Sequence, residues 1–316
     1  MTRTSLPTAA RPFVRLDSDK SETLDSVNPQ LVRELYKEHG ALLLRGFSSD
    51  LEEFRRFAVD LCPIAVHNDS RTRVKLGPQD IQSVSLGTLA FPLHPELSRE
   101  PWKPDTCFFY CINPPTSGGA TTICDGVAIV RELPAELKQT MAGRRLKYTL
   151  GARVEELQYW LGTSQPDEAA LADPPPHCPY RFERVGSQLT RVFTRPLLHR
   201  PMFTDELAFG NFLLFARFLR GRTFPLLDDG TPVPEEWLQT VKQVSDRLTV
   251  PIAWQRGDLL ILDNSRFMHG RTAVTEGDDR LIATYFGYLE FAVPDKEEPP
   301  NAIWRQPGFQ PPSAKP

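Results

Sequence analysis

The sequence lacks the features that mark membrane, secreted and nucleic-acid-binding proteins. Its 316 residues contain no apolar run of the about 18 residues that a membrane-spanning helix needs. The first residues, MTRTSLPTAARPF, contain no apolar stretch typical of a signal peptide. The net charge of −3 gives no reason to expect a nucleic acid or a membrane surface as a partner. We therefore expect a cytoplasmic globular protein that acts on a small molecule.

Cysteine and histidine are also scarce, with 5 and 6 residues, so few metal sites are open to this chain. An odd number of cysteines argues against a disulfide framework. Cys107 and Cys111, in TCFFYC, would lie on one face of a strand about 13 Å apart. That separation is too large for a shared zinc ion, so both are predicted to pack in the core.

Proline is abundant, with 30 residues that divide the chain into short apolar runs. This pattern favours strands and loops over long helices. The expected helices are residues 26–38, 51–62, 131–141, 209–220 and 234–248; the expected strands are 40–47, 80–93, 105–113, 120–126, 280–291 and a strand–turn–strand unit at 254–274. This order predicts a mainly β fold with flanking helices, a sandwich or barrel, and not a parallel βαβ array.

The whole chain, residues 1–316, is predicted to be one domain. Residues 151–205 are rich in proline and arginine, and we expect an irregular insertion that covers the mouth of an active site. Residues 297–316 are proline-rich, and we expect a mobile tail.

A histidine and a carboxylate stand two residues apart in FPLHPELSR. On a strand, His94 and Glu96 would point to the same face and could bind one metal ion. With 6 histidines and 40 acidic residues, however, such a pair arises about once by chance. A second pair, His67 and Asp69, stands upstream in HND, and the residues of the two pairs do not decide between them.

Two further polar residues stand in apolar surroundings near the end of the chain. His269 follows a predicted turn in LLILDNSRFMHGRT, where it is either a core histidine or a metal ligand. Arg280 opens an apolar strand and needs an anionic partner, which is either a structural carboxylate or a ligand.

Together, these residues have the composition of a site for non-haem Fe(II). Two histidines and one carboxylate on one face of the ion leave three positions open. A chelating 2-oxo acid fills two of them and O2 the third. An arginine supplies the bidentate cation that the remote carboxylate of 2-oxoglutarate requires.

The chain resembles the TauD/TfdA superfamily of Fe(II)/2-oxoglutarate dioxygenases, and most of all its SyrP-like branch, over roughly residues 38–290. The segments that carry this resemblance are GALLLRGF, H-P-E, PPTSGGATTICDG, WQRGDLLILDNSRFMHGRTAV and GDDRLIATYFG. The resemblance implies a double-stranded β-helix, or jelly-roll, core of the clavaminate synthase-like type.

The resemblance also implies a set of site residues. It makes His94, Glu96 and His269 the iron ligands, because the pair at 94 and 96 stands before the GG-x-T stretch as in the family. Arg280 and Thr121 would bind 2-oxoglutarate. Two departures stand out: the acidic ligand is Glu where the family commonly has Asp, and GG-D-T reads GG-A-T. A carboxylate at this position implies hydroxylation and not halogenation.

The expected substrate is a small amino-acid-like or natural-product intermediate, free or tethered to a carrier protein; a homo-oligomer is compatible with the sequence. The expected reaction hydroxylates an unactivated C–H bond and releases succinate and CO2. The same iron centre could instead carry out desaturation, cyclisation or epoxidation. A non-catalytic metal-binding barrel and a zinc hydrolase with the same ligands are the remaining alternatives.

Overall fold

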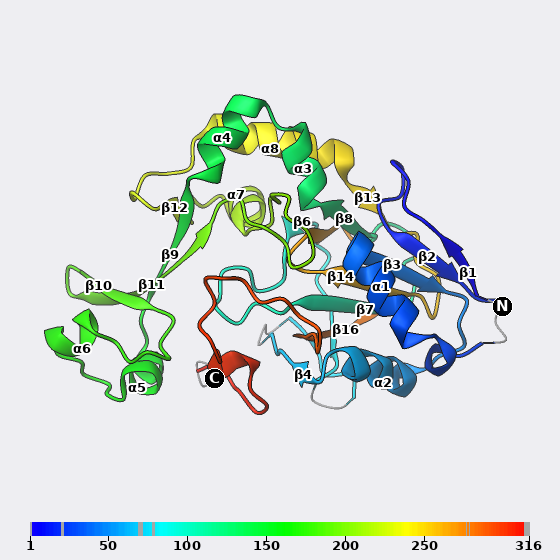
Figure 1. The fold of residues 1–316 in the computed structure, drawn as a ribbon, viewed down its shortest axis with the longest axis horizontal. Coiled ribbons are helices and arrows are strands. Elements are labelled where there is room, and N and C mark those ends of the chain that lie inside the picture. Colours follow the sequence, from blue (N-terminus) through cyan, green and yellow to red (C-terminus); the bar gives the residue numbers. More distant parts are fainter. Residues whose placement is uncertain are drawn as a thin grey trace.

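The fold has four layers: two β-sheets packed face to face, with helices over both outer faces (Figure 1). A computed structural model describes residues 2–19, 22–68, 72–77, 80–275, 277 and 279–312. It confirms the predicted mainly β architecture with several helices.

The first sheet is the larger one. Within the described residues it has eight strands: β1 (Arg3–Ser5), β2 (Val14–Asp17), β3 (Ala41–Arg45), β14 (Leu259–Asp263), β7 (Thr106–Asn113), β16 (Leu281–Tyr288) and β4 (Ile64–Ala65), in this order, with β5 (Gln82–Ser83) paired to β16. The second sheet has the order β13 (Val250–Pro251), β8 (Thr121–Asp125), β15 (Phe267–Arg271) and β6 (Phe91–His94).

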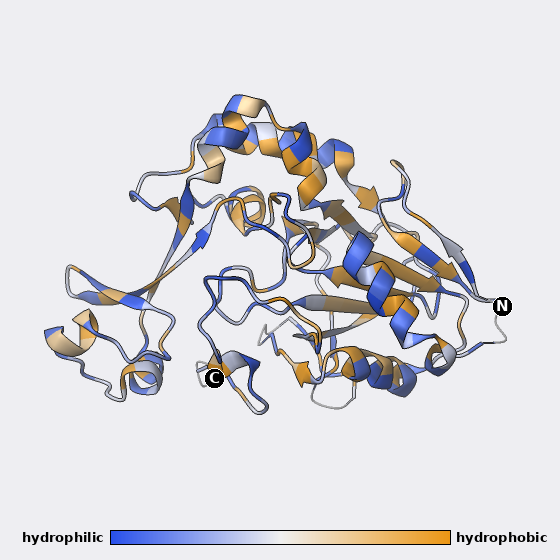
Figure 2. Ribbon diagram, viewed as in Figure 1, coloured by the Kyte–Doolittle hydropathy of each residue, from blue (hydrophilic) through white to orange (hydrophobic). Residues whose placement is uncertain are grey.

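Strand β14 shows why its first four residues, LLIL, are all apolar. Side chains alternate between the two faces of a strand. Leu259 and Ile261 pack under helices α1 (Pro29–His39) and α2 (Leu51–Leu61), while Leu260 and Leu262 pack against the second sheet. Both faces are therefore buried, and the run is apolar along its length (Figure 2).

The remaining helices of the main body cover the outer face of the second sheet. They are α3 (Gly126–Glu132), α4 (Ala135–Ala142), α7 (Leu213–Arg220) and α8 (Glu235–Leu248). Their apolar side chains share one cluster with Leu93, Cys124 and Met268 of the sheet. This layer positions α7 beside β6, the strand that ends at His94.

A third sheet forms an arm that projects from this body on the left of Figure 1. Its order is β10 (Arg181–Val185), β11 (Gln188–Pro196), β9 (Arg145–Gly151) and β12 (Leu226–Leu227), and helices α5 (Val154–Leu161) and α6 (Glu168–Ala172) lie at its far end. Residues 151–205 were expected to be irregular, and this expectation was wrong. Their elements are short, of 5 to 9 residues, so the dense proline and arginine between them conceal the periodicity.

Three other predicted elements needed correction. The helix expected at 131–141 is two helices, because Pro134 cannot continue α3. The helix expected at 209–220 begins only at Leu213, where the Asn211 side chain caps its first amide. Of the strand expected at 80–93, only the two ends form strands, β5 and β6. Between them, the carbonyls of residues 85, 87 and 89 accept hydrogen bonds from Arg271 and not from a neighbouring strand.

The described part of the tail, residues 297–312, packs against the body. Trp304 is buried, and Arg305 forms an ion pair with Asp105 at 2.8 Å. Tail mobility stays a prediction, but in the structure this segment has fixed partners. All five cysteines are free, and Cys107 and Cys111 are fully buried, as predicted for core residues.

Candidate metal and cosubstrate site

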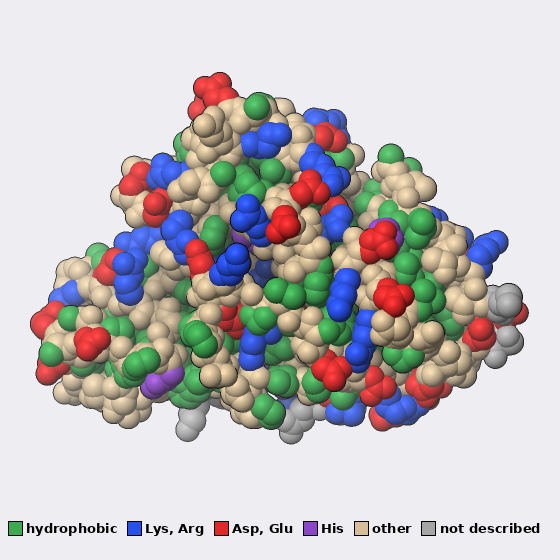
Figure 3. All heavy atoms as spheres, viewed as in Figure 1, with side chains coloured by type: hydrophobic (Ala, Val, Ile, Leu, Met, Phe, Trp, Pro, Cys, Tyr) green, Lys and Arg blue, Asp and Glu red, His purple; other side chains and the backbone are tan. Residues whose placement is uncertain are grey.

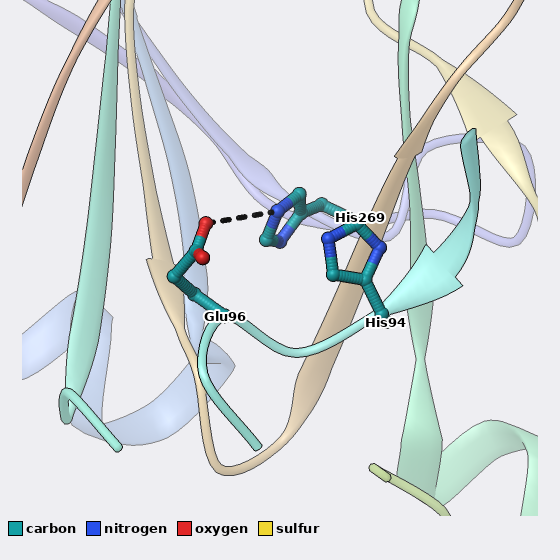
Figure 4. A group of neighbouring side chains, drawn as sticks. All are labelled: His94, Glu96 and His269. Carbon is teal, nitrogen blue, oxygen red and sulfur yellow. Dashed lines mark ion pairs between the residues drawn. The ribbon is translucent and has the colours of Figure 1, made fainter. Parts of the chain in front are cut away.

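The inner face between the two sheets brings His94, Glu96 and His269 together (Figure 4). His94 is the last residue of β6 and is directly opposite His269 of β15. One ligand atom from each of the three side chains lies within 4.8 Å of the others. Among the described residues, these three form a group of His, Cys, Asp or Glu side chains spaced to hold a metal ion.

Glu96 reaches the site from a turn and not from a strand, because β6 ends two residues earlier. The Asn264 side chain fixes this turn: it accepts from the Glu96 amide at 2.8 Å and donates to the carbonyls of Glu96 and Pro104. Asn264 belongs to the turn between β14 and β15, so the same connection that positions His269 also positions Glu96.

The Glu96 carboxylate has two partners that the sequence pattern did not indicate. Asn68 donates to Oε1 at 2.6 Å, and Arg73 donates to Oε2 at 2.9 Å. Burial by itself raises the pKa of Glu96, but the charge of Arg73, the neighbouring His269 and His94, and the hydrogen bond from Asn68 outweigh it and lower the pKa. The carboxylate is therefore ionised, as a metal ligand must be.

His67 and Asp69, the rival ligand pair, do not share this position. His67 lines a surface cavity of about 330 Å³ beside the tail and is not part of the three-residue group. Asp69 lies outside the described residues. Its neighbour Asn68 reaches the site, but as a hydrogen-bond donor to Glu96.

Both histidines are held in their neutral, metal-binding form. Burial lowers the pKa of His269 to about 3, and the neighbouring His94 adds to this effect. Burial also lowers the pKa of His94. Nδ1 of His94 lies 2.9 Å from the Pro92 carbonyl, which only accepts, so Nδ1 carries the proton and Nε2 keeps a free lone pair.

Arg280 and Thr121 contact each other on the same inner face, two residues along β8 from the position opposite His269. Thr121 is opposite Arg271 in the ladder in which Ile123 is opposite His269, so it lies about 7 Å along the strand from that position. Arg280 donates to Thr121 Oγ1 at 3.2 Å and to the Gly119 carbonyl at 2.6 Å. Trp254 also donates to Thr121 Oγ1, at 3.0 Å.

The two glycines before Thr121 make room for this arginine. Gly118 and Gly119 have φ of +68° and +62°, in the left-handed region that side chains disfavour. A Cβ on Gly118 would lie 2.3 Å from the Ala273 carbonyl oxygen, and one on Gly119 would lie 2.8 Å from Cδ of Arg280. The GG of PPTSGGAT is therefore needed for the chain to pass this close to Arg280.

Arg271 is a further buried cation that the sequence analysis missed. It lies two residues after His269 on β15, so both side chains point inward. Its guanidinium donates to the carbonyls of Ser85, Gly87 and Leu89, and burial lowers its pKa to about 10. Arg271 thus ties loop 85–89 to the strand that carries His269. The H-x-R spacing was the available signal.

An aromatic wall lies beside His94. Phe215 of α7 has its ring centroid 4.6 Å from that of His94 and stacks on Phe91 and Phe212. The arm contacts the turn after Glu96 from another direction: Arg191 pairs with Glu100 at 3.1 Å, and Arg195 donates to the Glu100 carbonyl. Arg191 is buried.

Charged groups of both signs are mixed over the surface drawn in Figure 3, in agreement with the small net charge. In the part of the chain that the structure describes, no helix combines the length and apolarity that crossing a membrane requires.

Comparisons with known proteins define the class of this protein. The family described as "Taurine catabolism dioxygenase TauD, TfdA family" matches residues 3–285. The chain therefore belongs to the TauD/TfdA family. It is an Fe(II)/2-oxoglutarate-dependent dioxygenase, with Fe(II), 2-oxoglutarate and O2 as the cofactor and cosubstrates of the class.

Solved structures share the fold at low sequence identity. PvcB from Pseudomonas aeruginosa is 17% identical with a TM-score of 0.60, over 92% of this chain and 93% of PvcB. A taurine dioxygenase from Burkholderia xenovorans is 15% identical with a TM-score of 0.63, over 96% and 97% of the two chains. AAD-2, in complex with Mn(II) and N-oxalylglycine, is 13% identical with a TM-score of 0.58, over 93% and 98%. The comparison with curated protein sequences gives no match.

Proposed function

We propose that this dioxygenase binds Fe(II) through His94, Glu96 and His269 and hydroxylates an unactivated C–H bond of a small amino-acid-like or natural-product intermediate. The observation that carries the proposal is the convergence of the three ligand atoms within 4.8 Å. The two packed sheets would then form the double-stranded β-helix that the sequence resemblance implies.

The donor set fits the metal. Two neutral imidazoles and one ionised carboxylate match the facial arrangement of non-haem Fe(II) sites and leave one side of the ion open. Neighbours hold each donor in place: Pro92 orients the His94 ring, and Asn264 fixes the backbone of Glu96. With iron and 2-oxoglutarate bound, the centre supplies the oxidation, in which 2-oxoglutarate gives succinate and CO2 and one oxygen atom enters the substrate.

Arg280 and Thr121 are the proposed binding site for the remote carboxylate of 2-oxoglutarate. Thr121 Oγ1 already accepts from Trp254 and Arg280, so its own proton can be donated to a ligand. Arg280 is buried and brings a fixed cation, which favours a dianionic cosubstrate over a neutral one.

The substrate would lie on the open side of the metal, against apolar and aromatic side chains. The wall of Phe91, Phe212 and Phe215 beside His94 excludes water from this side and suits an aliphatic portion. We propose that the insertion 151–205 covers this mouth, since its Arg191 and Arg195 contact the turn after Glu96. Membership of the SyrP-like branch and tethering to a carrier protein are part of the same proposal.

Anaerobic absorption spectroscopy tests the proposal directly. The protein is titrated with Fe(II) and then with 2-oxoglutarate, and candidate amino acids, free or as carrier-bound thioesters, are screened for perturbation of the iron-to-keto-acid band. Hits are then exposed to O2, and the products are identified by mass spectrometry. A product 16 Da heavier than the substrate, formed with one succinate, supports hydroxylation.

Two other outcomes of this experiment count against parts of the proposal. A product 2 Da lighter than the substrate identifies desaturation or cyclisation at the same centre. Absence of the absorption band in the wild-type protein with Fe(II) and 2-oxoglutarate would overturn the ligand assignment. Turnover in the absence of O2 would instead indicate a hydrolase.

A further inference from the structure

The two oxygens of the Glu96 carboxylate have different surroundings. Asn68 donates to Oε1 at 2.6 Å. Oε2 lies 3.8 Å from Nε2 of His269, and this same oxygen accepts from Arg73 at 2.9 Å. The oxygen that faces the histidine is therefore the one that the guanidinium occupies.

Arg73 is itself nearly buried, with 10% of its side chain exposed. It donates to Thr284 Oγ1 at 3.3 Å and stacks over the ring of Phe286, with its guanidinium carbon 5.0 Å from the centroid. Among the described residues, Glu96 supplies the carboxylate that Arg73 contacts. Thr284 and Phe286 belong to β16, so Arg73 contacts this strand and the Glu96 carboxylate at the same time.

A divalent ion between His94, His269 and Glu96 would need the position next to Oε2. Metal–oxygen bonds in such sites are about 2.0–2.2 Å long. The ion would then lie within a few ångströms of the guanidinium, with little water between them to screen the repulsion of two cations. Arg73 and the metal therefore cannot both keep their best geometry at this oxygen.

We propose that Arg73 is a positioning residue that competes with the metal for Oε2 of Glu96; this inference rests on the proposed metal site. In the metal-free protein, Arg73 neutralises a buried carboxylate that would otherwise be without a counter-charge. When the metal binds, the guanidinium withdraws toward Thr284 and Phe286, and Asn68 keeps the carboxylate oriented through Oε1. Metal loading is thus an exchange of one cation for another.

Mn(II), an air-stable substitute for Fe(II), is the probe, and calorimetric titration without 2-oxoglutarate is the measurement. Arg73→Gln removes the competing charge, and Asn68→Ala is the matched control that removes a hydrogen bond to the same carboxylate without changing charge. We expect Arg73→Gln to bind Mn(II) about 10- to 100-fold more tightly than the wild type, the range over which partners of a metal ligand act. We expect Arg73→Lys to bind like the wild type and Asn68→Ala to bind equally or more weakly.

A measurement on the wild-type protein covers the case in which Arg73→Gln does not fold without metal. Val74 follows Arg73 in the chain and is held by two hydrogen bonds. Its amide donates to Ser83 Oγ at 2.9 Å, and its carbonyl accepts from the Ser83 amide at 2.7 Å. If Mn(II) releases Arg73 from Glu96, amide hydrogen exchange at residues 72–77 should become faster. If Arg73 stays on Glu96, a more rigid carboxylate should slow it.

The outcomes separate this inference from the proposed function. Unchanged or weaker Mn(II) binding by Arg73→Gln, or slower exchange at residues 72–77 on loading, overturns the competition while leaving the site intact. Failure of the wild type to bind one Mn(II), or binding that survives His94→Ala, overturns the metal site itself.

Discussion

Two arginine–carboxylate clusters of this protein differ in which side chains lie beside the ion pair. At the tail, Arg305 faces two carboxylates: it binds Asp105 through two bonds of 2.8 Å and Glu298 through bonds of 2.6 and 3.0 Å. At the proposed metal site, Arg73 binds the single carboxylate of Glu96, which lies beside two histidines.

The difference separates a cluster whose carboxylates bond to an arginine and backbone from the cluster proposed to bind a metal. Every oxygen of Asp105 and Glu298 has a partner in Arg305, and the Asp105 carboxylate also accepts from the Leu289 amide. Both oxygens of Glu96 also accept a hydrogen bond, from Asn68 and Arg73, but Oε2 additionally lies 3.8 Å from Nε2 of His269, with His94 in the same group. A buried ion pair by itself is therefore weak evidence for function; the two histidines grouped with Glu96 are the informative part.

The largest expected effect comes from breaking the metal-site cluster. Glu96→Ala should lower the rate of succinate formation by more than about 100-fold, the upper range for residues that merely support a metal ligand. Iron content after anaerobic loading should fall with it. His67→Ala is the matched control, because His67 lies outside the three-residue group. Full activity in Glu96→Ala together with loss in His67→Ala would show that the ligand pair was assigned wrongly.

Breaking the tail cluster should affect stability and not metal binding. Arg305→Gln leaves the buried Asp105 and the partly buried Glu298 without this cation, which costs about 3–5 kcal/mol of unfolding free energy. Urea unfolding of the metal-free protein measures this cost, and Mn(II) titration checks that affinity is kept. Equal stability of the variant and the wild type would mean that the tail does not hold these contacts in solution.

A third variant separates cosubstrate binding from metal binding. Arg280→Gln removes a charged donor worth about 1.5–3 kcal/mol, so KM for 2-oxoglutarate should rise about 10- to 100-fold. Iron affinity should not change, because Arg280 contacts Thr121 and Gly119 and not the three ligands. Arg280→Lys should recover part of the loss. A variant with unchanged KM would place the carboxylate elsewhere.

The smallest expected effect, taken per pH unit, is a pH dependence of the stability of the metal-free protein. Burial lowers the pKa of His269 to about 3. As pH falls below about 6.5, this histidine therefore binds a proton in the unfolded chain but not in the folded chain. Stability present above pH 6.5 is therefore lost as pH falls toward 3, by roughly 1.4 kcal/mol per pH unit for this group. His269→Gln should show a shallower loss in urea unfolding at several pH values. His199, whose pKa burial also lowers to about 3, retains its share of the slope in that variant. An equal slope in both proteins would contradict the assignment.

Much of the fold followed from local sequence. The apolar runs at 41–45, 106–113 and 259–263 are buried strands, as predicted, because a strand covered on both faces has apolar residues throughout. Helix α2 begins at the predicted place because Asp50 and Glu53 form a capping box. The arm was missed because no element in it is long enough to show a period above the surrounding prolines and arginines.

The sequence by itself determined which residue types were available for chemistry: few histidines, no disulfide framework, and a glycine pair, threonine and arginine in the order that the family shows. The residues of the two His-x-acid pairs did not by themselves determine which pair joins His269, since either spacing suits a strand; the resemblance to the family favoured His94 and Glu96.

Tertiary structure decided that question, because the ladder of β6 and β15 puts His94 opposite His269. It also brought Asn68 and Arg73 to Glu96. Asn68 precedes Glu96 by 28 residues and Arg73 precedes it by 23, in a segment whose sequence shows no periodicity. They reach the carboxylate because β5 pairs with β16 and places that segment over the inner face. Contacts between residues this far apart depend on strand pairing, and no local pattern encodes them.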